Sequence, residues 1–214
     1  MKRNFAEFIA TFAMVLFATG AGIVSQEFPG YISHLGISVI VGGIITAMIY
    51  VFGKISGAHM NPVVTLVLWT DKHLTWKHAT GYIISQFVGA VLASYALHLL
   101  FPSNELLSGT YPVGSDMQSW ILECILTFIL VMVVFRFVDS KNHKYANWAG
   151  RVIGLVVLLE VYFAGPICGA SMNPFRSLAP ALVSGNLSQQ WIYLTAPVVG
   201  GFAALLADKV VRSK

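Results

Sequence analysis

Charged residues are scarce in this sequence. They make up 10% of its 214 residues, and 57% of the residues are hydrophobic, whereas a soluble domain has about 25% charged residues. This composition excludes an ordinary water-soluble domain, so we expect a membrane protein. The segment after Met1-Lys2-Arg3 stays apolar for about 20 residues and contains Glu7, which favours a first spanning helix over a cleavable signal peptide.

Patterns of cysteine and of metal ligands are also lacking. The two cysteines, Cys124 and Cys168, lie in or beside apolar runs and indicate neither a disulfide framework nor a metal site. The six histidines show no ligand spacing such as HExxH, and no nucleophile and base pair stands near another polar cluster. We therefore expect no metal, no other cofactor and no enzymatic activity.

Long apolar runs are what the sequence does contain. Six of them are long enough to cross about 30 Å of hydrocarbon as helices. Two shorter stretches, about 61–70 and 173–183, would reach only about 15 Å as helices, so they can enter a membrane but cannot cross it. We predict an all-α membrane protein with six spanning helices and two re-entrant half-helices. The six long runs cover about residues 5–25, 36–53, 79–101, 118–138, 148–165 and 190–207.

The basic residues gather on one side of this predicted topology. With the N-terminus inside, the loops of the opposite side contain Glu27, Glu105 and Asp116, with Arg176 as their basic residue. The positive-inside rule then places both termini in the cytoplasm. The net charge of +4 reflects this topology, so we expect no nucleic-acid partner. The residues on the cytoplasmic side or at its boundary are Lys2, Arg3, Lys54, Lys72, Lys77, Arg136, Lys141, Lys144, Arg151, Lys209, Arg212 and Lys214.

One sequence motif occurs twice in the chain. GAHMNPVVTL at residues 57–66 returns as GASMNPFRSL at residues 169–178, and the segment that begins at Glu7 is echoed by the segment that begins at Glu123. The chain is thus predicted to be one domain, 1–214, with duplicated halves at about 1–103 and 117–214. Each half has three spanning helices, an odd number, so the copies should lie in the membrane with opposite orientation. The two half-helices should then enter from opposite faces and meet near the midplane.

The Asn-Pro pair in each copy predicts the start of a half-helix. Asn is among the best N-cap residues and Pro is favoured at the first helical position, so Asn61-Pro62 and Asn173-Pro174 should begin the two half-helices. If the side-chain oxygen of each asparagine caps its own helix, the NH₂ group is left pointing outward as a fixed donor. Two such donors would orient a passing water or hydroxyl through its oxygen.

The segments before the asparagines, Ile55–Met60 and Ile167–Met172, are predicted to be non-helical. Such backbone is tolerated at membrane depth only where it is buried in protein or lines a watery cavity. Glu7 and Glu123 are predicted to support these segments by accepting from their unpaired N–H groups; protonated glutamates in a helix contact are the alternative. The carbonyls expected to form a ladder of acceptors belong to Gly57, Ala58, His59, Gly169, Ala170 and Ser171.

Taken together, these features resemble the aquaporin and aquaglyceroporin family of major intrinsic proteins, over essentially the whole chain. The most specific are the paired motifs SGAHMNPVVTL and GASMNPFRS at their proper spacing. The segment FAGPICGASMNPFRSLAPAL is most similar to the corresponding segment of nodulin-type intrinsic proteins and their bacterial relatives. This subgroup includes channels for metalloids and small neutral solutes. The resemblance implies a passive channel, assembled as a homotetramer in the cell membrane, whose partners are the lipid bilayer, water and small neutral solutes.

The resemblance also implies a second constriction, or selectivity filter, formed by four residues. Water-selective members are known for bulky aromatic and histidine residues at the first two positions, where this chain has valines. A wider and more apolar opening would admit glycerol, urea, boric acid or arsenous acid as well as, or instead of, water. The positions lie 20 residues before Asn61, and 12 before, three before and three after Asn173; they are Val41, Val161, Ala170 and Arg176.

Some residues depart from the family pattern. Val63 and Phe175 follow the two prolines, where alanine is common. Phe175 would either pack against the opposing half-helix or protrude and narrow the passage. Glu160 stands where nodulin-type members usually carry a neutral polar residue, and we expect it beside the pore rather than in its wall. Ser177 and Ala181 fit the water-channel pattern better than the glycerol-channel pattern.

These departures leave alternatives open. A strict water channel is one, and a structural or junctional protein that has lost conduction is another. An alternating-access transporter also has inverted repeats and broken helices. Against a transporter, no intramembrane carboxylate falls at the Asn-Pro tips, where a coupling ion would be bound.

Overall fold

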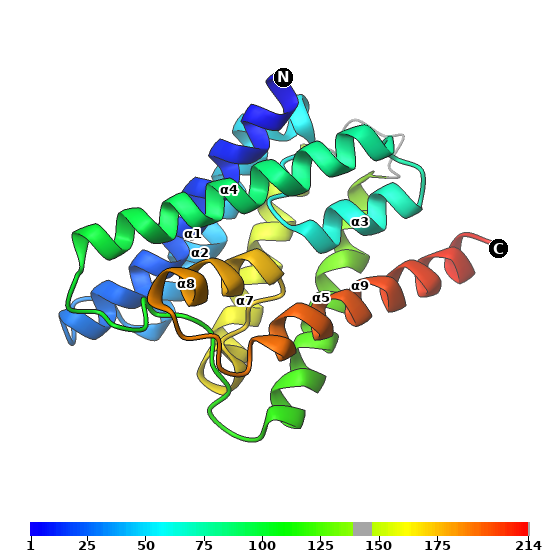
Figure 1. The fold of residues 1–214 in the computed structure, drawn as a ribbon. Helices are drawn as coiled ribbons and strands as arrows, with labels where there is room; N and C mark the ends of the chain where they lie inside the picture. Colours follow the sequence, from blue (N-terminus) through cyan, green and yellow to red (C-terminus); the bar gives the residue numbers. More distant parts are fainter. Residues whose placement is uncertain (139–146, 214) are drawn as a thin grey trace.

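The computed structural model describes residues 1–138 and 147–213, and within them the chain forms helices and no strands (Figure 1). Six of these helices are long and apolar enough to cross a membrane, so the predicted all-α fold is confirmed. Lys141, Lys144 and Lys214, assigned above to the cytoplasmic side, lie outside the described residues. The helices are α1 (Lys2–Glu27), α2 (His34–Ser56), α3 (Pro62–Thr70), α4 (Trp76–Leu100), α5 (Asp116–Val138), α7 (Ala149–Cys168), α8 (Pro174–Ser184) and α9 (Gln190–Arg212).

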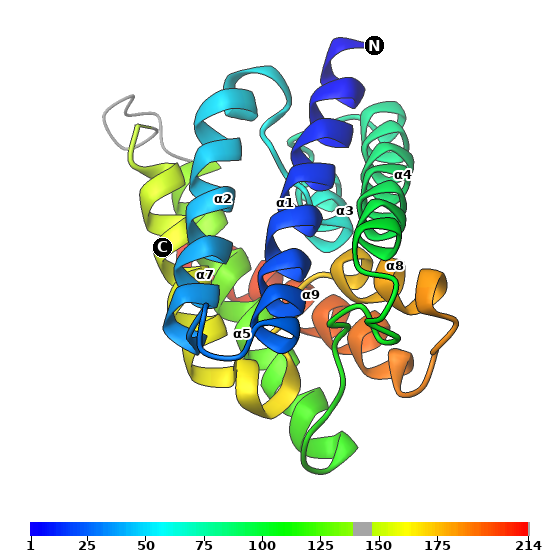
Figure 2. The ribbon, with the colours of Figure 1, turned by 90° about the vertical axis from the view of Figure 1, so that its left-hand side faces the viewer.

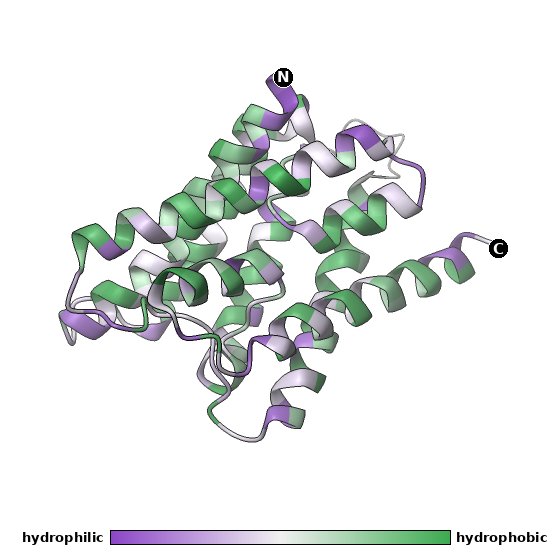
Figure 3. Ribbon diagram, in the orientation of Figure 1, coloured by the Kyte–Doolittle hydropathy of each residue, from purple (hydrophilic) through white to green (hydrophobic). Residues whose placement is uncertain are grey.

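The helices pack in two matching sets. α1 contacts α2 and α4, α5 contacts α7 and α9 in the same manner, and α2 packs against α7 to join the sets. The short helices α3 and α8 each contact both α4 and α9, within the bundle (Figure 2). Hydrophobic residues cover most of each long helix, and hydrophilic residues gather near the helix ends (Figure 3). This distribution is what a lipid-embedded bundle requires.

Two glycines let the paired helices of each set approach closely. A Cβ atom on Gly89 of α4 would collide with the carbonyl oxygen of Phe8 in α1, and a Cβ on Gly200 of α9 would collide with that of Cys124 in α5. Small residues at such contacts allow helix backbones to come together in lipid. The same close contact therefore occurs once in each set.

We expect Gly200→Ala to destabilise the protein by about 1–3 kcal/mol, because the added methyl overpacks the backbone of α5. The matched control is Gly43→Ala in α2, where an added Cβ meets no heavy atom within 4 Å. Thermal unfolding of the purified protein in detergent measures both. An equal melting temperature for the two variants would contradict this account of the α5–α9 contact.

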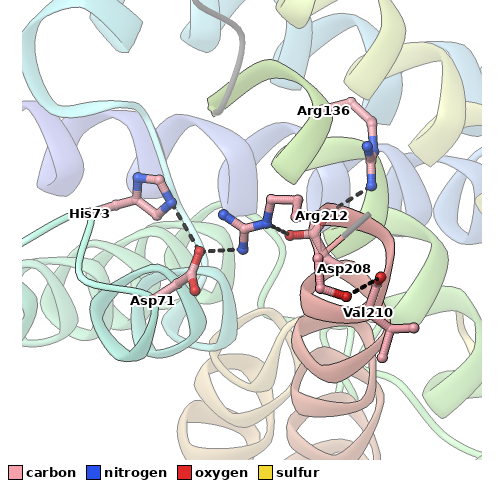
Figure 4. Close-up of polar contacts among 7 residues, drawn as sticks. Asp71, His73, Arg136, Asp208, Val210 and Arg212 are labelled. Carbon is pink, nitrogen blue, oxygen red and sulfur yellow. Dashed lines mark hydrogen bonds and ion pairs between the residues drawn. The ribbon is translucent and has the colours of Figure 1, made fainter.

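Charged side chains join the ends of α5 and α9 to the segment after α3 (Figure 4). Arg212 places Nη2 2.6 Å from Asp71 Oδ2 and Nε 2.6 Å from Asp208 Oδ2. Arg136 Nη2 lies 2.7 Å from Asp208 Oδ1, and His73 Nε2 lies 3.1 Å from Asp71 Oδ2. The cluster thus ties the C-terminal turn of α9 to the end of the half-helix α3.

Stability should depend on pH through Asp71. Partial burial alone would raise the pKa of its carboxyl, but the hydrogen bond and charge of Arg212, followed by those of His73, bring the pKa below its ordinary value. A lowered folded-state pKa gives stability that is present above the ordinary carboxyl pKa of about 3.9 and is lost as the pH falls through the lowered value. Asp71→Asn should therefore melt below wild type at neutral pH, and the difference should disappear in strong acid. A difference that persists there would contradict the assignment to this ion pair.

Candidate functional site

The two asparagines begin α3 and α8 as the Asn-Pro pairs predict. Asn61 Oδ1 accepts a hydrogen bond from the N–H of Val63 at 2.9 Å. Asn173 Oδ1 accepts from the N–H groups of Phe175 and Arg176, at 3.0 and 3.4 Å. Both asparagines are extended at the N-cap, and the proline is the first helical residue. Each side-chain oxygen therefore caps its own half-helix.

The amide groups of the asparagines lie differently from the prediction. Asn61 Nδ2 donates to the carbonyl oxygen of Met172 at 2.8 Å, and Asn173 Nδ2 donates to that of Met60 at 2.7 Å. Each NH₂ group thus binds the loop that precedes the other asparagine, and one of its two hydrogens is used inside the protein. The prediction that the NH₂ group points outward as a donor did not include this bond, because it treated each half separately. The crossed bonds hold the N-termini of α3 and α8 together.

The non-helical segments are shorter than predicted. α2 continues to Ser56 and α7 to Cys168, and each helix ends at a left-handed glycine, Gly57 with φ 97° and Gly169 with φ 85°. Left-handed backbone follows at non-glycine residues in both copies, at Ala58, Met60, Ala170 and Met172. Such a conformation costs roughly 1–2 kcal/mol per residue, so the surrounding contacts must hold these loops in place.

The Glu7 carboxylate supplies such contacts to the first loop. Its Oε1 accepts from the N–H of His59 at 2.9 Å and the hydroxyl of Ser56 at 2.6 Å. Its Oε2 accepts from the N–H of Met60 at 2.9 Å and Nε2 of Gln86 at 2.8 Å. Glu7 is fully buried, so these four donors compensate the loss of water around the carboxylate.

Glu123 has the corresponding place below the second loop. It is fully buried, and its two oxygens accept from the N–H groups of Ser171 and Met172, both at 2.7 Å. Ser171 also donates through its hydroxyl to the carbonyl of Asn173 and pairs with the Ser177 hydroxyl. The structure therefore brings each glutamate to the loop that its sequence position suggested.

A cavity of about 340 Å³ runs along the bundle to the asparagine pair. Both asparagines border it, together with Gly57, Ala58, His59 and Ser171 of the predicted carbonyl ladder. Gly169 and Ala170, the other two members of that ladder, lie outside its wall. Apolar side chains line most of the remaining surface: Met14, Ile45, Ile49, Val64, Leu68, Leu130, Val134, Phe137, Ile153 and Val157. A passage with mostly apolar walls and a smaller number of polar groups therefore reaches the asparagines at the N-termini of the two half-helices.

The four proposed filter residues are not among those that border this cavity. Val41 is one helical turn from Ile45 and Val161 one turn from Val157, in each case away from the cavity. Val41, Val161 and Ala170 share one apolar cluster, with exposures of 8, 7 and 3%. Nη1 of Arg176 is buried and has no hydrogen-bond partner among the residues that the structure describes.

The two residues after the prolines contact the long helices α4 and α9. The ring of Phe175 meets Phe87 of α4 edge to face, with centroids 5.3 Å apart. Val63 lies against Gly201 of α9. The ring of Phe175 thus packs on α4 and against the central apolar cluster, and it is not among the residues that border the cavity.

Comparison of the sequence with known proteins identifies the family of this chain. The sequence model of the family described as "Major intrinsic protein" matches residues 1–207. The chain belongs to this family. The rice protein "Aquaporin NIP1-1" (Oryza sativa subsp. japonica) is 38% identical over 213 residues, which cover 99% of this chain and 75% of the relative. "Nodulin-26" of Glycine max is 37% identical over 213 residues, with coverage of 99% and 78%.

A solved structure extends the comparison to three dimensions. The aquaglyceroporin from Plasmodium falciparum superposes with a TM-score of 0.85 at 25% identity, over 96% of this chain and 93% of the other. Major intrinsic proteins are membrane channels and not enzymes. The chain is accordingly a channel for water and small solutes, as the resemblance predicted.

Several residues of the channel site were missed from the sequence. Ser56 and Gln86 bind Glu7, and the carbonyls of Met60 and Met172 hold the asparagines. A signal for Gln86 existed, since it is a polar residue inside a long apolar run. The roles of the Met60 and Met172 carbonyls could not be predicted from the sequence, because every residue type has a backbone carbonyl.

Proposed function

We propose that this channel passes small neutral solutes, such as glycerol, urea or undissociated metalloid acids, in addition to water. Two observations carry the proposal: the small apolar side chains of Val41, Val161 and Ala170 share one cluster, and a buried guanidinium nitrogen of Arg176 has no hydrogen-bond partner among the described residues. Aliphatic walls accommodate the carbon side of a polyol, and the guanidinium donates to its hydroxyl oxygens. The names of the relatives support the choice, since the superposed structure is that of an aquaglyceroporin.

Exclusion of ions follows from the same site. The helix N-termini at Asn61 and Asn173 carry partial positive charge, and their crossed hydrogen bonds bring them together. Arg176 adds a full positive charge three residues after Asn173. Cations therefore meet electrostatic repulsion, while a neutral solute exchanges hydrogen bonds with water for hydrogen bonds with the pore.

The proposal includes orientation and assembly. The distribution of basic residues supports cytoplasmic termini in the cell membrane, with the cavity opening beside Lys54 on the cytoplasmic side. Membership of the family supports a homotetramer in which each chain has its own pore. Within this frame the domain comprises two inverted halves, about 1–103 and 117–214, whose Asn-Pro motifs meet at the centre of the pore.

Stopped-flow light scattering on proteoliposomes tests the function. Shrinkage under an impermeant osmolyte reports water permeability, and re-swelling under glycerol, urea or arsenous acid reports solute permeability. Rapid re-swelling would support the proposed filter. Water flux without solute flux would favour a strict water channel and refute the solute specificity, and absence of both would favour a non-conducting protein.

The variant Val161→Phe should reduce glycerol re-swelling by about tenfold or more, which corresponds to a barrier about 1.4 kcal/mol higher. The larger ring narrows the constriction, so water permeability should fall much less. The matched control is Val199→Phe on α9, at a side chain that is 48% exposed on the outside of the bundle. Unchanged glycerol flux in Val161→Phe would place the constriction elsewhere.

A further inference from the structure

The loop that connects the two sets of helices reaches the second loop of the channel site. This connecting loop comprises residues 101–115, between α4 and α5. The N–H of Val113 in it donates to the carbonyl of Ile167 in the last turn of α7, at 3.0 Å. A Cβ atom on Gly169 would lie 3.0–3.3 Å from atoms of Thr110. The connecting loop therefore packs against the point where α7 ends and the second loop begins.

The Thr110 hydroxyl begins a chain of buried hydroxyl groups. It donates to the Ser177 hydroxyl of α8 at 2.6 Å, and Ser177 pairs with the hydroxyl of Ser171 in the second loop. Ser171 donates in turn to the carbonyl of Asn173 at 2.8 Å. All three hydroxyl side chains belong to residues that are at most 5% exposed. Each hydroxyl gives its one proton to the next acceptor, so the chain links the connecting loop to the asparagine that caps α8.

The first half contains the equivalent cluster with a different donor. Thr65 and Ser177 each lie four residues after the asparagine of their half, and His59 corresponds to Ser171 by the same offset of 112 residues. The Thr65 hydroxyl pairs with Nδ1 of His59 at 3.0 Å and accepts from Nε2 of Gln86 at 3.0 Å. The Gln86 amide of α4 thus makes, in the first half, the contact that the connecting loop makes in the second.

Helix α9 has no amide at the position that corresponds to Gln86. Tyr82 of α4 and Tyr193 of α9 donate their hydroxyls, each at 2.8 Å, to the carbonyl of the last residue of α2 and of α7, so the two tyrosines are equivalent. Gln86 follows Tyr82 by four residues, whereas the residue four after Tyr193 is Pro197, which has no side-chain donor. The donor to Ser177 therefore comes from outside the helix that supplies it in the first half.

We propose that Thr110 is a positioning residue for the second loop, and that its bond to Ser177 takes the place of the Gln86 amide of the first half. The second loop carries Ala170, and α8, which holds Ser177, carries Arg176. Both residues belong to the filter of the proposed function, on which this inference rests. The connecting loop, which contacts the second loop through Thr110, thereby acts on the selectivity of the pore without being part of its wall.

Loss of the Thr110 hydroxyl should loosen the second loop. Ala170 and Met172 in this loop have left-handed backbone, which persists only where surrounding contacts hold it. Thr110→Val keeps the shape of the side chain and removes the donor to Ser177. Local opening of the loop should then become roughly two- to tenfold more frequent, the range expected for the loss of one hydrogen bond.

Hydrogen–deuterium exchange of the full chain in lipid nanodiscs measures this opening. The amides of residues 169–173 should exchange faster in Thr110→Val than in wild type, and those of residues 57–61 should change less. Thr110→Ser keeps the hydroxyl and should exchange as wild type does. The matched control is Thr19→Val in α1, because Thr19 is also buried but its hydroxyl has no hydrogen-bond partner among the described residues. This control should leave both loops unchanged.

Flux through proteoliposomes tests the link to selectivity. The ratio of glycerol to erythritol permeability should fall in Thr110→Val, because a loosened filter discriminates less between solutes of different size. Thr110→Ser should restore the ratio. A purely structural effect, which lowers the amount of folded channel, would reduce both fluxes equally and leave the ratio at its wild-type value. An unchanged ratio would therefore refute the role of Thr110 in selectivity.

Two exchange results would overturn the proposal. The first is wild-type exchange of residues 169–173 in Thr110→Val, and the second is equal acceleration in Thr110→Ser, which would show that the hydroxyl is not the cause. Where Thr110→Val does not assemble, Ser177→Ala removes the same bond from the acceptor side, and wild-type exchange in that variant also overturns it. If neither solute passes through wild type, the proposed function fails, and the exchange rates still decide whether Thr110 positions the loop.

Discussion

Replacing Glu7 by leucine is expected to abolish water flux and to destabilise the folded channel by several kcal/mol. The leucine would leave four donors without their acceptor: two backbone N–H groups, the Ser56 hydroxyl and the Gln86 amide. Each buried donor left unsatisfied costs about 1–3 kcal/mol. The left-handed residues Ala58 and Met60 would also lose the contacts that hold them, so the first loop should no longer keep its path.

The measurement for this prediction is thermal unfolding in detergent together with stopped-flow water permeability. Glu7→Gln is the conservative variant and should be intermediate, because an amide oxygen still accepts but carries no charge. Glu105→Gln, at an exposed carboxyl, should behave as wild type. A Glu7→Leu protein with wild-type melting temperature and flux would show that the loop is held by other contacts.

Replacing Arg176 by leucine is expected to admit cations and to impair solute flux. At an effective dielectric constant of about 20, a unit charge about 5 Å from a passing cation repels it by about 3 kcal/mol, or roughly 100-fold in population. Removing that charge also removes a donor whose Nη1 has no partner in the described part of the protein. Glycerol re-swelling should therefore fall while cation leak rises.

Ion conductance in planar bilayers and glycerol re-swelling measure the two effects separately. Arg176→Lys keeps the charge but not the planar fork of donors, so it should continue to exclude cations and should recover solute flux only in part. Unchanged cation exclusion in Arg176→Leu would assign the barrier to the helix N-termini at the asparagines alone.

Most of the fold could be predicted from the sequence, because a lipid bilayer restricts the backbone conformations that a spanning segment can adopt. Backbone groups in a bilayer must be satisfied within a helix, so the apolar runs predicted α1, α2, α4, α5, α7 and α9 to within a few residues. The Asn-Pro pairs gave the starts of α3 and α8 through local capping chemistry. The helix ends at Gly57 and Gly169 were less well placed, because the predicted break was set two residues too early.

Contacts between segments distant in the chain were decided by tertiary structure alone. The crossed bonds from Asn61 to Met172 and from Asn173 to Met60 join residues more than 100 positions apart. The packing of Phe175 on Phe87 and the position of Glu160 outside the cavity wall likewise depend on which helices become neighbours. A local sequence pattern reports how one segment meets lipid and how its own helix begins. The partner of each buried polar group is decided only when the two halves of the chain have packed together. A hydrogen bond requires its donor and acceptor atoms to lie within about 3 Å of each other.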